Sequence, residues 1–203
     1  MNLLAPHGTK EGMEEERLVA ALRNAEPEAV QELLARYGDR LLRSAFLLCG
    51  NEAEAQDLVQ DTFLEALRAG PRFRGRSTLY TWLHGILLNL TRHYHRDRKR
   101  LVYDDELVGR EASEPQDNLA GLDVATGSAS LTSALRQLSQ PHREVLILRF
   151  YENMKVHEVA AHLGVSQGTV KSRLHYALSQ MQKLLPAELN LFGAGGTKET
   201  AQR

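Results

Sequence analysis

The chain has 203 residues, of which 42% are hydrophobic, and a formal net charge of −1. This length allows one or two small domains, and the near-zero charge excludes a uniformly basic nucleic-acid binder. The single cysteine, Cys49, excludes an internal disulfide framework and a cysteine-rich zinc site, and its apolar surroundings indicate a buried structural thiol.

Helical spacing of apolar residues dominates residues 13 to about 100, and signals for strands are absent. A first helix is expected to start at Glu26-Pro27 and to end before a glycine-asparagine pair at position 50. A second is expected over about 52–69, where a glycine-proline pair stops it. Ser77 is predicted to cap a last helix that reaches Arg100.

The next segment, residues 101 to about 130, has a different composition, with seven acidic residues against one basic residue. It is too polar to bury a core and is therefore predicted to be a flexible acidic linker. The sequence thus predicts an all-α protein of two small helical domains. The expected order is an N-terminal extension at 1–24, a domain at 25–100, the linker at 101–130, a domain at 131–185 and a disordered tail at 186–203.

Two helices joined by a tight turn are predicted for residues 156–181. Gly164 can take the left-handed conformation that ends the first helix, and Ser166 stands where the second needs an N-cap. The opposite face of the second helix is polar and cationic, which is the layout of a helix-turn-helix that enters a DNA major groove. The alternative is an ordinary helical hairpin in a core. The apolar faces repeat at helical spacing: Val156, Val159, Ala160 and Leu163, then Val170, Leu174, Ala177 and Met181.

A basic stripe precedes the linker. Residues 68–100 contain nine Lys or Arg residues and one acidic residue, Asp97. Cations neutralise phosphates, and exposed aromatic rings can stack on unpaired bases, so this stripe suits a nucleic-acid surface. The alternative is a solvated charged helix with Trp82 in the core. His93 and His95 lie two residues apart on a helix and face different ways, so no metal site is expected. The residues spaced to share the face are Trp82, Gly85, Asn89, Arg92 and Arg96.

The helix predicted for 52–69 also has two faces. One is apolar, and the other carries acidic and amide groups around Leu64. Such a face can dock a basic protein partner, although on physical grounds alone a solvated face is the commoner outcome. The second face consists of Asp57, Gln60, Asp61, Leu64 and Arg68.

Three runs of the sequence are informative when they are taken together: AEAQDLVQDTFLEALRA (53–69), FRGRSTLYTWLHGILLNLTRHYHR (73–96) and LRQLSQPHREVLILRFYENMKVHEVAAHLGVSQGTVKSRLHYAL (135–178). They resemble the second and fourth conserved regions of the extracytoplasmic-function (ECF) sigma factors, group IV of the sigma-70 family. The resemblance covers roughly residues 25–185. It implies a non-enzymatic initiation factor without a cofactor, active in a stress or envelope-signal response. The implied partners are core RNA polymerase, promoter DNA with −35 and −10 elements, and an anti-sigma factor.

The resemblance also implies roles for individual residues. The clamp helices of the largest polymerase subunit would contact Asp57, Gln60, Asp61 and Leu64. The melted, single-stranded −10 element would contact Arg74, Arg76, Trp82, Asn89, Arg92, His93 and Arg96. The duplex −35 element would contact Lys155, Gly168, Thr169, Lys171, Ser172, Arg173, His175 and Tyr176.

Two positions depart from the family pattern and leave the promoter sequence open. Gly85 stands where many relatives carry a basic residue, and Tyr176 stands where an arginine is common.

Two other function classes fit parts of the sequence. A LuxR-like regulator would share the helix-turn-helix and would bind a palindromic operator as a dimer without polymerase. A nuclease could hold a metal at Asp57, Asp61 and Glu65, which follow one another at i, i+4 and i+8. The first domain lacks the βα alternation of a receiver domain, and no nucleophile–base set is visible. Both alternatives are therefore less favoured than the sigma factor.

The chain is expected to be cytoplasmic. No segment approaches 18 uninterrupted apolar residues, so no transmembrane helix is predicted. Residues 1–17 lack a basic start followed by a long apolar stretch, so they do not resemble a secretion signal.

Overall fold

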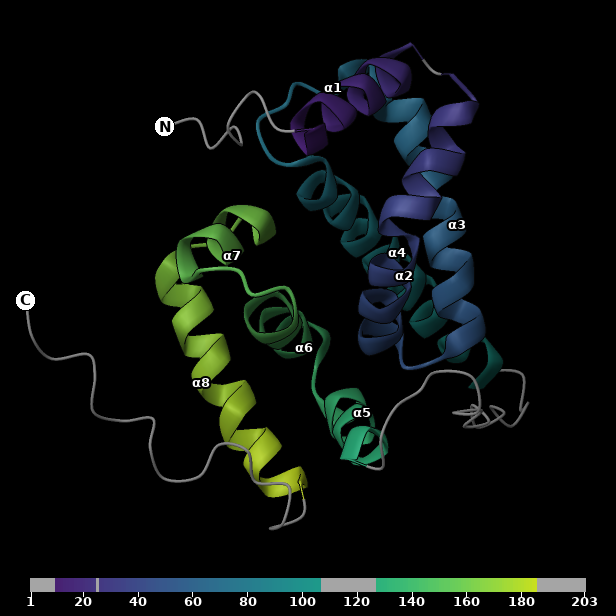
Figure 1. The fold of residues 1–203 in the computed structure, drawn as a ribbon. Helices are drawn as coiled ribbons and strands as arrows, with labels where there is room; N and C mark the ends of the chain where they lie inside the picture. Colours follow the sequence, from purple (N-terminus) through teal and green to yellow (C-terminus); the bar gives the residue numbers. More distant parts are fainter. Residues whose placement is uncertain (1–9, 25, 107–126, 186–203) are drawn as a thin grey trace, which may run out of the picture. The chain divides into compact units, whose positions relative to one another are not determined.

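The computed structural model describes residues 10–24, 26–106 and 127–185. Every regular element in these ranges is a helix, which confirms the all-α prediction (Figure 1). The chain divides into two compact units, Met1–Asp117 and Asn118–Arg203. Within the described ranges, none of the helices has the length and apolar character needed to cross a membrane. Most of the predicted linker and the whole predicted tail lie outside the described residues.

The first unit is built on a helical hairpin. A two-residue turn joins its helices, in which Gly50 takes a left-handed φ of 78° and the Asn51 side chain accepts a hydrogen bond from the backbone N–H of Glu54. The helix bounds confirm the two predicted for this stretch. The elements of the unit are α1 (Lys10–Arg23), α2 (Glu28–Cys49), α3 (Glu52–Ala69), the 3₁₀ turn η1 (Gly70–Arg72) and α4 (Leu79–Glu106).

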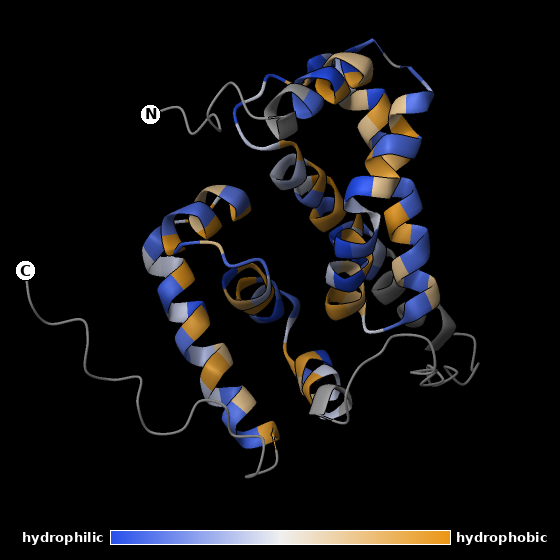
Figure 2. Cartoon of the chain, in the orientation of Figure 1, coloured by the Kyte–Doolittle hydropathy of each residue, from blue (hydrophilic) through white to orange (hydrophobic). Residues whose placement is uncertain are grey.

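The core of this unit lies where α2, α3 and α4 pack against one another. Leu33 and Leu41 of α2, Phe63 of α3, and Leu83 and Leu87 of α4 are all at most 3% exposed. Figure 2 shows the hydrophobic residues gathered on the facing sides of these helices and the hydrophilic residues on the outer sides. Full burial of one such side chain stabilises the fold by roughly 1.5–3 kcal/mol, so this seam fixes how each helix is rotated about its axis.

A row of polar and aromatic side-chain contacts connects α2 to α4 beside this core. The buried His84 places Nε2 2.8 Å from Ser44 Oγ. The guanidinium carbon of Arg40 lies 3.8 Å from the centre of the Tyr80 ring. The centres of the Tyr37 and Tyr80 rings lie 5.8 Å apart. Burial raises the pKa of Tyr37, and the nearby Glu15 carboxylate of α1 raises it further, while Arg36 of α2 opposes both.

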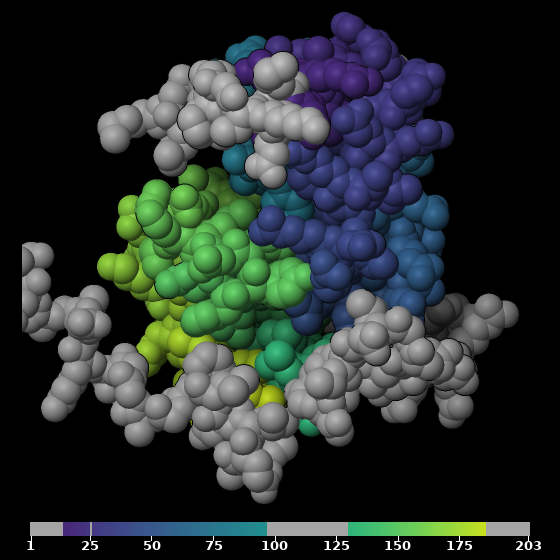
Figure 3. Space-filling view, viewed as in Figure 1, coloured from purple at the N-terminus to yellow at the C-terminus, as the bar shows by residue number. Residues whose placement is uncertain are grey.

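Helix α1 lies within the stretch predicted as an N-terminal extension, 1–24, and packs in the same unit. Leu18 and Leu22 of α1 are fully buried, and the helix packs on α2, α3 and η1. Figure 3 shows the side chains of α1, in purple, closing over this unit beside α2. Gly70 lies so close to α1 that a Cβ atom there would sit 2.4 Å from the backbone oxygen of Leu22. This glycine therefore serves close helix packing as well as the end of α3.

The start and end of α4 differ from the sequence prediction. The helix begins at Leu79. The Thr78 hydroxyl accepts a hydrogen bond from the backbone N–H of Thr81 at 3.2 Å, so Thr78 is the N-cap. Ser77, the predicted cap, lies one residue too early. Neighbouring hydroxyl residues offer equivalent local signals, and the path of the preceding loop decides between them. The helix also runs past Arg100 to Glu106, into the segment predicted as linker.

The second unit is a compact helical cluster in which α8 packs against α6 and α7. Its buried core contains Val145, Leu148, Val159, Val170 and Met181. A π-helical turn, in which the Glu152 N–H donates to the Ile147 carbonyl at 2.9 Å, follows α6 and was not predicted. The elements are α5 (Gly127–Gln137), α6 (Gln140–Leu146), the π turn η2 (Ile147–Tyr151), α7 (Val156–Leu163) and α8 (Gln167–Leu184).

The contact at Gly70 predicts a stability defect. In Gly70→Ala the new methyl group would overlap the Leu22 carbonyl, so α1 must shift. We expect a loss of about 1–3 kcal/mol in the free energy of unfolding, measured by urea denaturation. Gly168→Ala is the matched control, because a Cβ there meets nothing closer than 3.6 Å. Equal stability of Gly70→Ala and wild type would contradict the close packing.

Candidate functional site

The exposed face of α3 brings together the four residues predicted for a protein partner. Asp57, Gln60, Asp61 and Leu64 follow one another at helical spacing, and all four are exposed. Leu64 is 51% exposed although it is a large apolar side chain. The buried face of the same helix holds the hairpin together, so this outer face is available. An exposed leucine flanked by carboxylates suits a partner surface that combines apolar and basic groups.

A short loop, Phe73–Thr78, joins η1 to α4 and carries two of the predicted cations. Arg74 and Arg76 are exposed on either side of Gly75, whose φ of 66° is left-handed. A side chain is rarely tolerated at such a φ, so the turn favours glycine there. The turn thus presents both guanidinium groups to solvent just ahead of α4. We call this segment the 73–78 loop.

The predicted basic face of α4 begins at Trp82, which is in contact with the core and with solvent. Its ring packs on the buried Phe73 ring with centroids 4.8 Å apart, yet Trp82 remains partly exposed. Further along, Asn89 and Arg96 are exposed and Arg92 is partly exposed. Structural packing and availability for stacking are therefore compatible at Trp82.

His93 lies beside this face and is tied to Arg96, whose Nη2 is 2.6 Å from His93 Nδ1. The hydrogen bond holds a ring and a cation together at the exposed surface. No group of three or more His, Cys, Asp or Glu side chains able to hold a metal occurs in the part of the chain that the structure describes.

The turn of the predicted helix-turn-helix has the expected geometry. Gly164 ends α7 with a left-handed φ of 67°, and its N–H donates to the Ala160 carbonyl. Ser166 Oγ then accepts a hydrogen bond from the Thr169 backbone N–H at 3.0 Å, which confirms Ser166 as the N-cap of α8. At the start of α7, the Glu158 carboxylate accepts the Lys155 backbone N–H at 2.7 Å. The predicted turn at Gly164 and the predicted N-cap at Ser166 are both confirmed.

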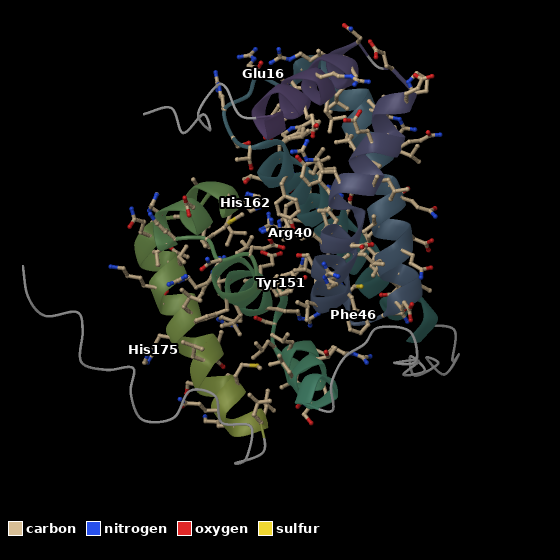
Figure 4. The ribbon with its side chains drawn as sticks, viewed as in Figure 1. Glu16, Arg40, Phe46, Tyr151, His162 and His175 are labelled. Atoms are coloured by element: carbon tan, nitrogen blue, oxygen red, sulfur yellow. The ribbon has the colours of Figure 1, made fainter. Side chains whose placement is uncertain are left out.

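The outer face of α8 presents the predicted polar set. Val170 and Ala177 are fully buried, whereas Lys171, Ser172 and His175 are exposed. Figure 4 shows His175 projecting outward from α8. The remaining predicted residues of the turn and helix divide between exposed positions, Lys155, Gly168 and Tyr176, and partly exposed positions, Thr169 and Arg173.

One residue of this surface was missed by the sequence analysis. His142 of α6 stacks on Tyr176 with ring centroids 4.5 Å apart and an interplanar angle of 30°, and its Nδ1 lies 2.7 Å from Ser139 Oγ. Burial lowers the pKa of His142, and the Arg173 guanidinium lowers it further. Because His142 lies on another helix, no spacing within 156–181 could reveal it. The stack orients Tyr176, which is 51% exposed, on the outer face of α8.

Comparison with known proteins places these surfaces in a family. The Sigma-70 region 2 family matches residues 33–101, and the Sigma-70, region 4 family matches residues 134–183. The ECF RNA polymerase sigma factor SigL of Mycobacterium tuberculosis is 32% identical over 166 residues, which are 79% of this chain and 91% of SigL. The chain belongs to the ECF sigma factor family. The α3 face, the 73–78 loop and α4 of this sigma factor lie in region 2, and its helix-turn-helix lies in region 4.

Two further relatives agree with this assignment. SigE of Mycolicibacterium smegmatis is 32% identical over 174 residues, which are 84% of this sigma factor but only 64% of SigE, slightly less than two thirds of its length. The solved structure of RpoE from Bartonella quintana, in complex with the anti-sigma factor NepR, is 29% identical with a TM-score of 0.56. That match covers 85% of this sigma factor and 94% of RpoE.

The cap of α8 predicts a separation of stability from DNA affinity. Ser166→Ala removes the acceptor for the Thr169 N–H and should destabilise region 4 by about 1 kcal/mol. Ser166→Asp keeps a capping oxygen, so thermal unfolding should stay near wild type. Its new negative charge should nevertheless weaken binding to duplex DNA, measured by fluorescence anisotropy. Equal unfolding of the alanine and aspartate variants would count against the cap.

The stacked histidine predicts a pH effect. Because the folded pKa of His142 lies below its ordinary value, the unfolded chain binds the proton first as pH falls. His142 therefore lowers stability as pH drops from neutral through its folded pKa, and His142→Gln should remove that part of the pH dependence. In Arg173→Ala the pKa of His142, followed by NMR, should rise but stay below the ordinary value, because burial is the larger cause. An unchanged pKa in this variant would refute the arginine's contribution.

Proposed function

We propose that this sigma factor directs core RNA polymerase to promoters with −35 and −10 elements and helps to open the −10 region. The observation that carries the proposal is that each of the two units has an exposed polar and cationic surface. One is the exposed α8 face of a capped helix-turn-helix, and the other is the basic surface of the 73–78 loop and α4. Family membership supports the same function.

The polymerase would dock on the α3 face. Asp57 and Asp61 offer charge to basic groups, Gln60 offers an amide, and Leu64 offers an apolar contact. We propose the clamp helices of the largest subunit as the partner element. The pattern supports this because a partly apolar, charged face suits a stable but reversible protein contact.

The −10 element would be captured as single strand by region 2. Turning a base out of the duplex costs a few kcal/mol, which contacts with the protein must offset. Trp82 can stack on a base, Asn89 can form hydrogen bonds with a base edge, and Arg74, Arg76, Arg92 and Arg96 can neutralise phosphates. His93 is held by Arg96 at the same surface. Opening driven by such capture needs no nucleotide hydrolysis, so we propose that the chain acts without catalysing a reaction.

The −35 element would be recognised as duplex by region 4. With α8 in the major groove, Arg173 and His175 are candidates for base edges, and Lys155 and Lys171 for phosphates. Gly168, without a side chain, allows the backbone near the helix start to approach DNA. Tyr176, oriented by His142, offers an aromatic ring where relatives commonly carry arginine, so the −35 sequence preference should differ from theirs. Thr169 and Ser172 complete the polar set.

Regulation would follow from covering these surfaces. The RpoE structure to which this chain is similar contains the anti-sigma factor NepR. We propose that an anti-sigma factor likewise restrains this chain in a stress or envelope-signal response, and that the chain acts in the cytoplasm, where the polymerase is. The domain boundaries at 25–100 and 131–185, with an acidic linker between them, remain part of this proposal.

In vitro transcription with core polymerase tests the function. Wild type should produce discrete start sites on genomic fragments that share −35 and −10 elements. Asp61→Arg reverses a charge on the α3 face, so core binding should weaken at least about tenfold, equivalent to ~1.4 kcal/mol, and the start sites should be lost. Asp39→Arg makes the same charge change at an exposed position on α2 and should leave both measurements near wild type.

Two results would contradict the proposal. Tight dimeric binding to a palindromic site, without start sites in the presence of core polymerase, would favour a LuxR-like regulator. Equal loss of core binding in Asp61→Arg and Asp39→Arg would mean that net charge, rather than the α3 face, governs docking.

A further inference from the structure

Helix α1 contacts both ends of the 73–78 loop. At the near end, Arg23 Nε donates a hydrogen bond to the Phe73 carbonyl at 3.1 Å. At the far end, Glu15 Oε1 accepts the backbone N–H of Leu79, the first residue of α4, at 3.2 Å. Figure 1 shows the segment between α3 and α4 passing beside α1. The two contacts bracket the stretch that carries Arg74 and Arg76.

Helix α1, which makes these two contacts, is itself anchored in the core of the unit. Leu18 and Leu22 are fully buried on the same side of α1, and Leu79 is 1% exposed. The backbone of α1 also lies against Gly70, the first residue of the η1 turn that precedes the loop, too close to admit a side chain there. The backbone positions of Glu15 and Arg23 relative to the loop are therefore fixed. Along the axis of α1 the two residues are separated by about 12 Å, at the usual helical rise.

Each contact meets a specific need of the loop. The first N–H groups of a helix have no partner within it, and a carboxylate there also interacts favourably with the helix dipole. Glu15 thus fixes where α4 begins, one turn before Trp82. Arg23 fixes the carbonyl of Phe73, whose ring supports the Trp82 ring. Both ends of the loop, and the aromatic pair behind it, are therefore positioned from α1.

We propose that α1 is a clasp that holds the 73–78 loop in the geometry required to open the −10 element, with Glu15 and Arg23 as positioning residues. The inference rests on the proposed function, since it assigns the loop to −10 opening. The hydrogen bonds of Glu15 and Arg23 end on Leu79 and Phe73, outside the α3 face, so their loss should leave docking on polymerase unchanged. The clasp sets the arrangement of Arg74, Arg76 and Trp82 before DNA arrives, which lowers the ordering cost at the moment of capture.

The test uses the full chain with core polymerase and compares a duplex promoter with one that is already unpaired at −10. Opening is followed by permanganate reactivity of unpaired thymines. Glu15→Ala and Arg23→Ala should each slow opening of the duplex promoter about tenfold, since hydrogen bonds to charged groups are among the stronger ones. Transcription from the unpaired template, and affinity for core polymerase, should stay within about twofold of wild type.

Matched variants separate positioning from general stability. Glu15→Gln keeps an oxygen that can accept the Leu79 N–H and should recover most of the opening rate. Glu14→Ala and Arg17→Ala change exposed residues of the same types on α1 and should open the promoter like wild type. Thermal unfolding of every variant identifies any that are merely unfolded, and for those the milder Arg23→Lys and Glu15→Gln pair is compared on the two templates.

The clasp is overturned if Glu15→Ala slows transcription equally on both templates, or if core affinity falls in step with the opening rate. Unaltered opening in both alanine variants would also overturn it. In each of these cases wild type still initiates, so the proposed function stands. A wild-type chain that initiates on neither template would instead remove the proposed function and the clasp together.

Discussion

Burial of one face each of α2, α3 and α4 is the constraint on which the region 2 surfaces depend. The seam of leucine and phenylalanine side chains fixes the rotation of each helix, because a turn of one residue, about 100°, would bring a carboxylate such as Asp61 into the core. Burying an unpaired carboxylate is costly enough to forbid that arrangement. The same packing therefore directs the α3 face outward and places Asn89 and Arg96 on the exposed side of α4.

Region 4 reaches a comparable result with a short turn that joins α7 to α8. Gly164 sets the turn between α7 and α8 by its left-handed backbone, and Ser166 caps α8 with its side chain. The connection between the two helices is therefore short. Val170, Ala177 and Met181 then anchor α8 to the core. What remains outward is polar and cationic, with the Tyr176 ring held by His142. Because each unit has its own core, each surface is formed independently of the other.

The N-terminal helix links packing to the proposed activity. Its contact with Gly70 is a backbone-to-backbone approach, and the hydrogen bonds from Glu15 and Arg23 extend that approach to both ends of the 73–78 loop. A loop with two exposed arginines and a left-handed glycine would otherwise sample many conformations. Tying its ends to a helix that is anchored by the buried Leu18 and Leu22 reduces that freedom, while Arg74 and Arg76 stay exposed.

Sequence alone determined the features that depend on neighbours along the chain. Apolar periodicity and turn residues predicted α2, α3, the helix-turn-helix, its cap and the outward sides of α3, α4 and α8, because helical spacing assigns faces without knowledge of the partner. Tertiary structure decided the rest. Thr78 rather than Ser77 caps α4, α1 joins the unit, and His142 meets Tyr176. These outcomes depend on contacts between segments that are remote in the chain, or on the loop path that such contacts impose. The local pattern of residues along the chain specifies neither of these.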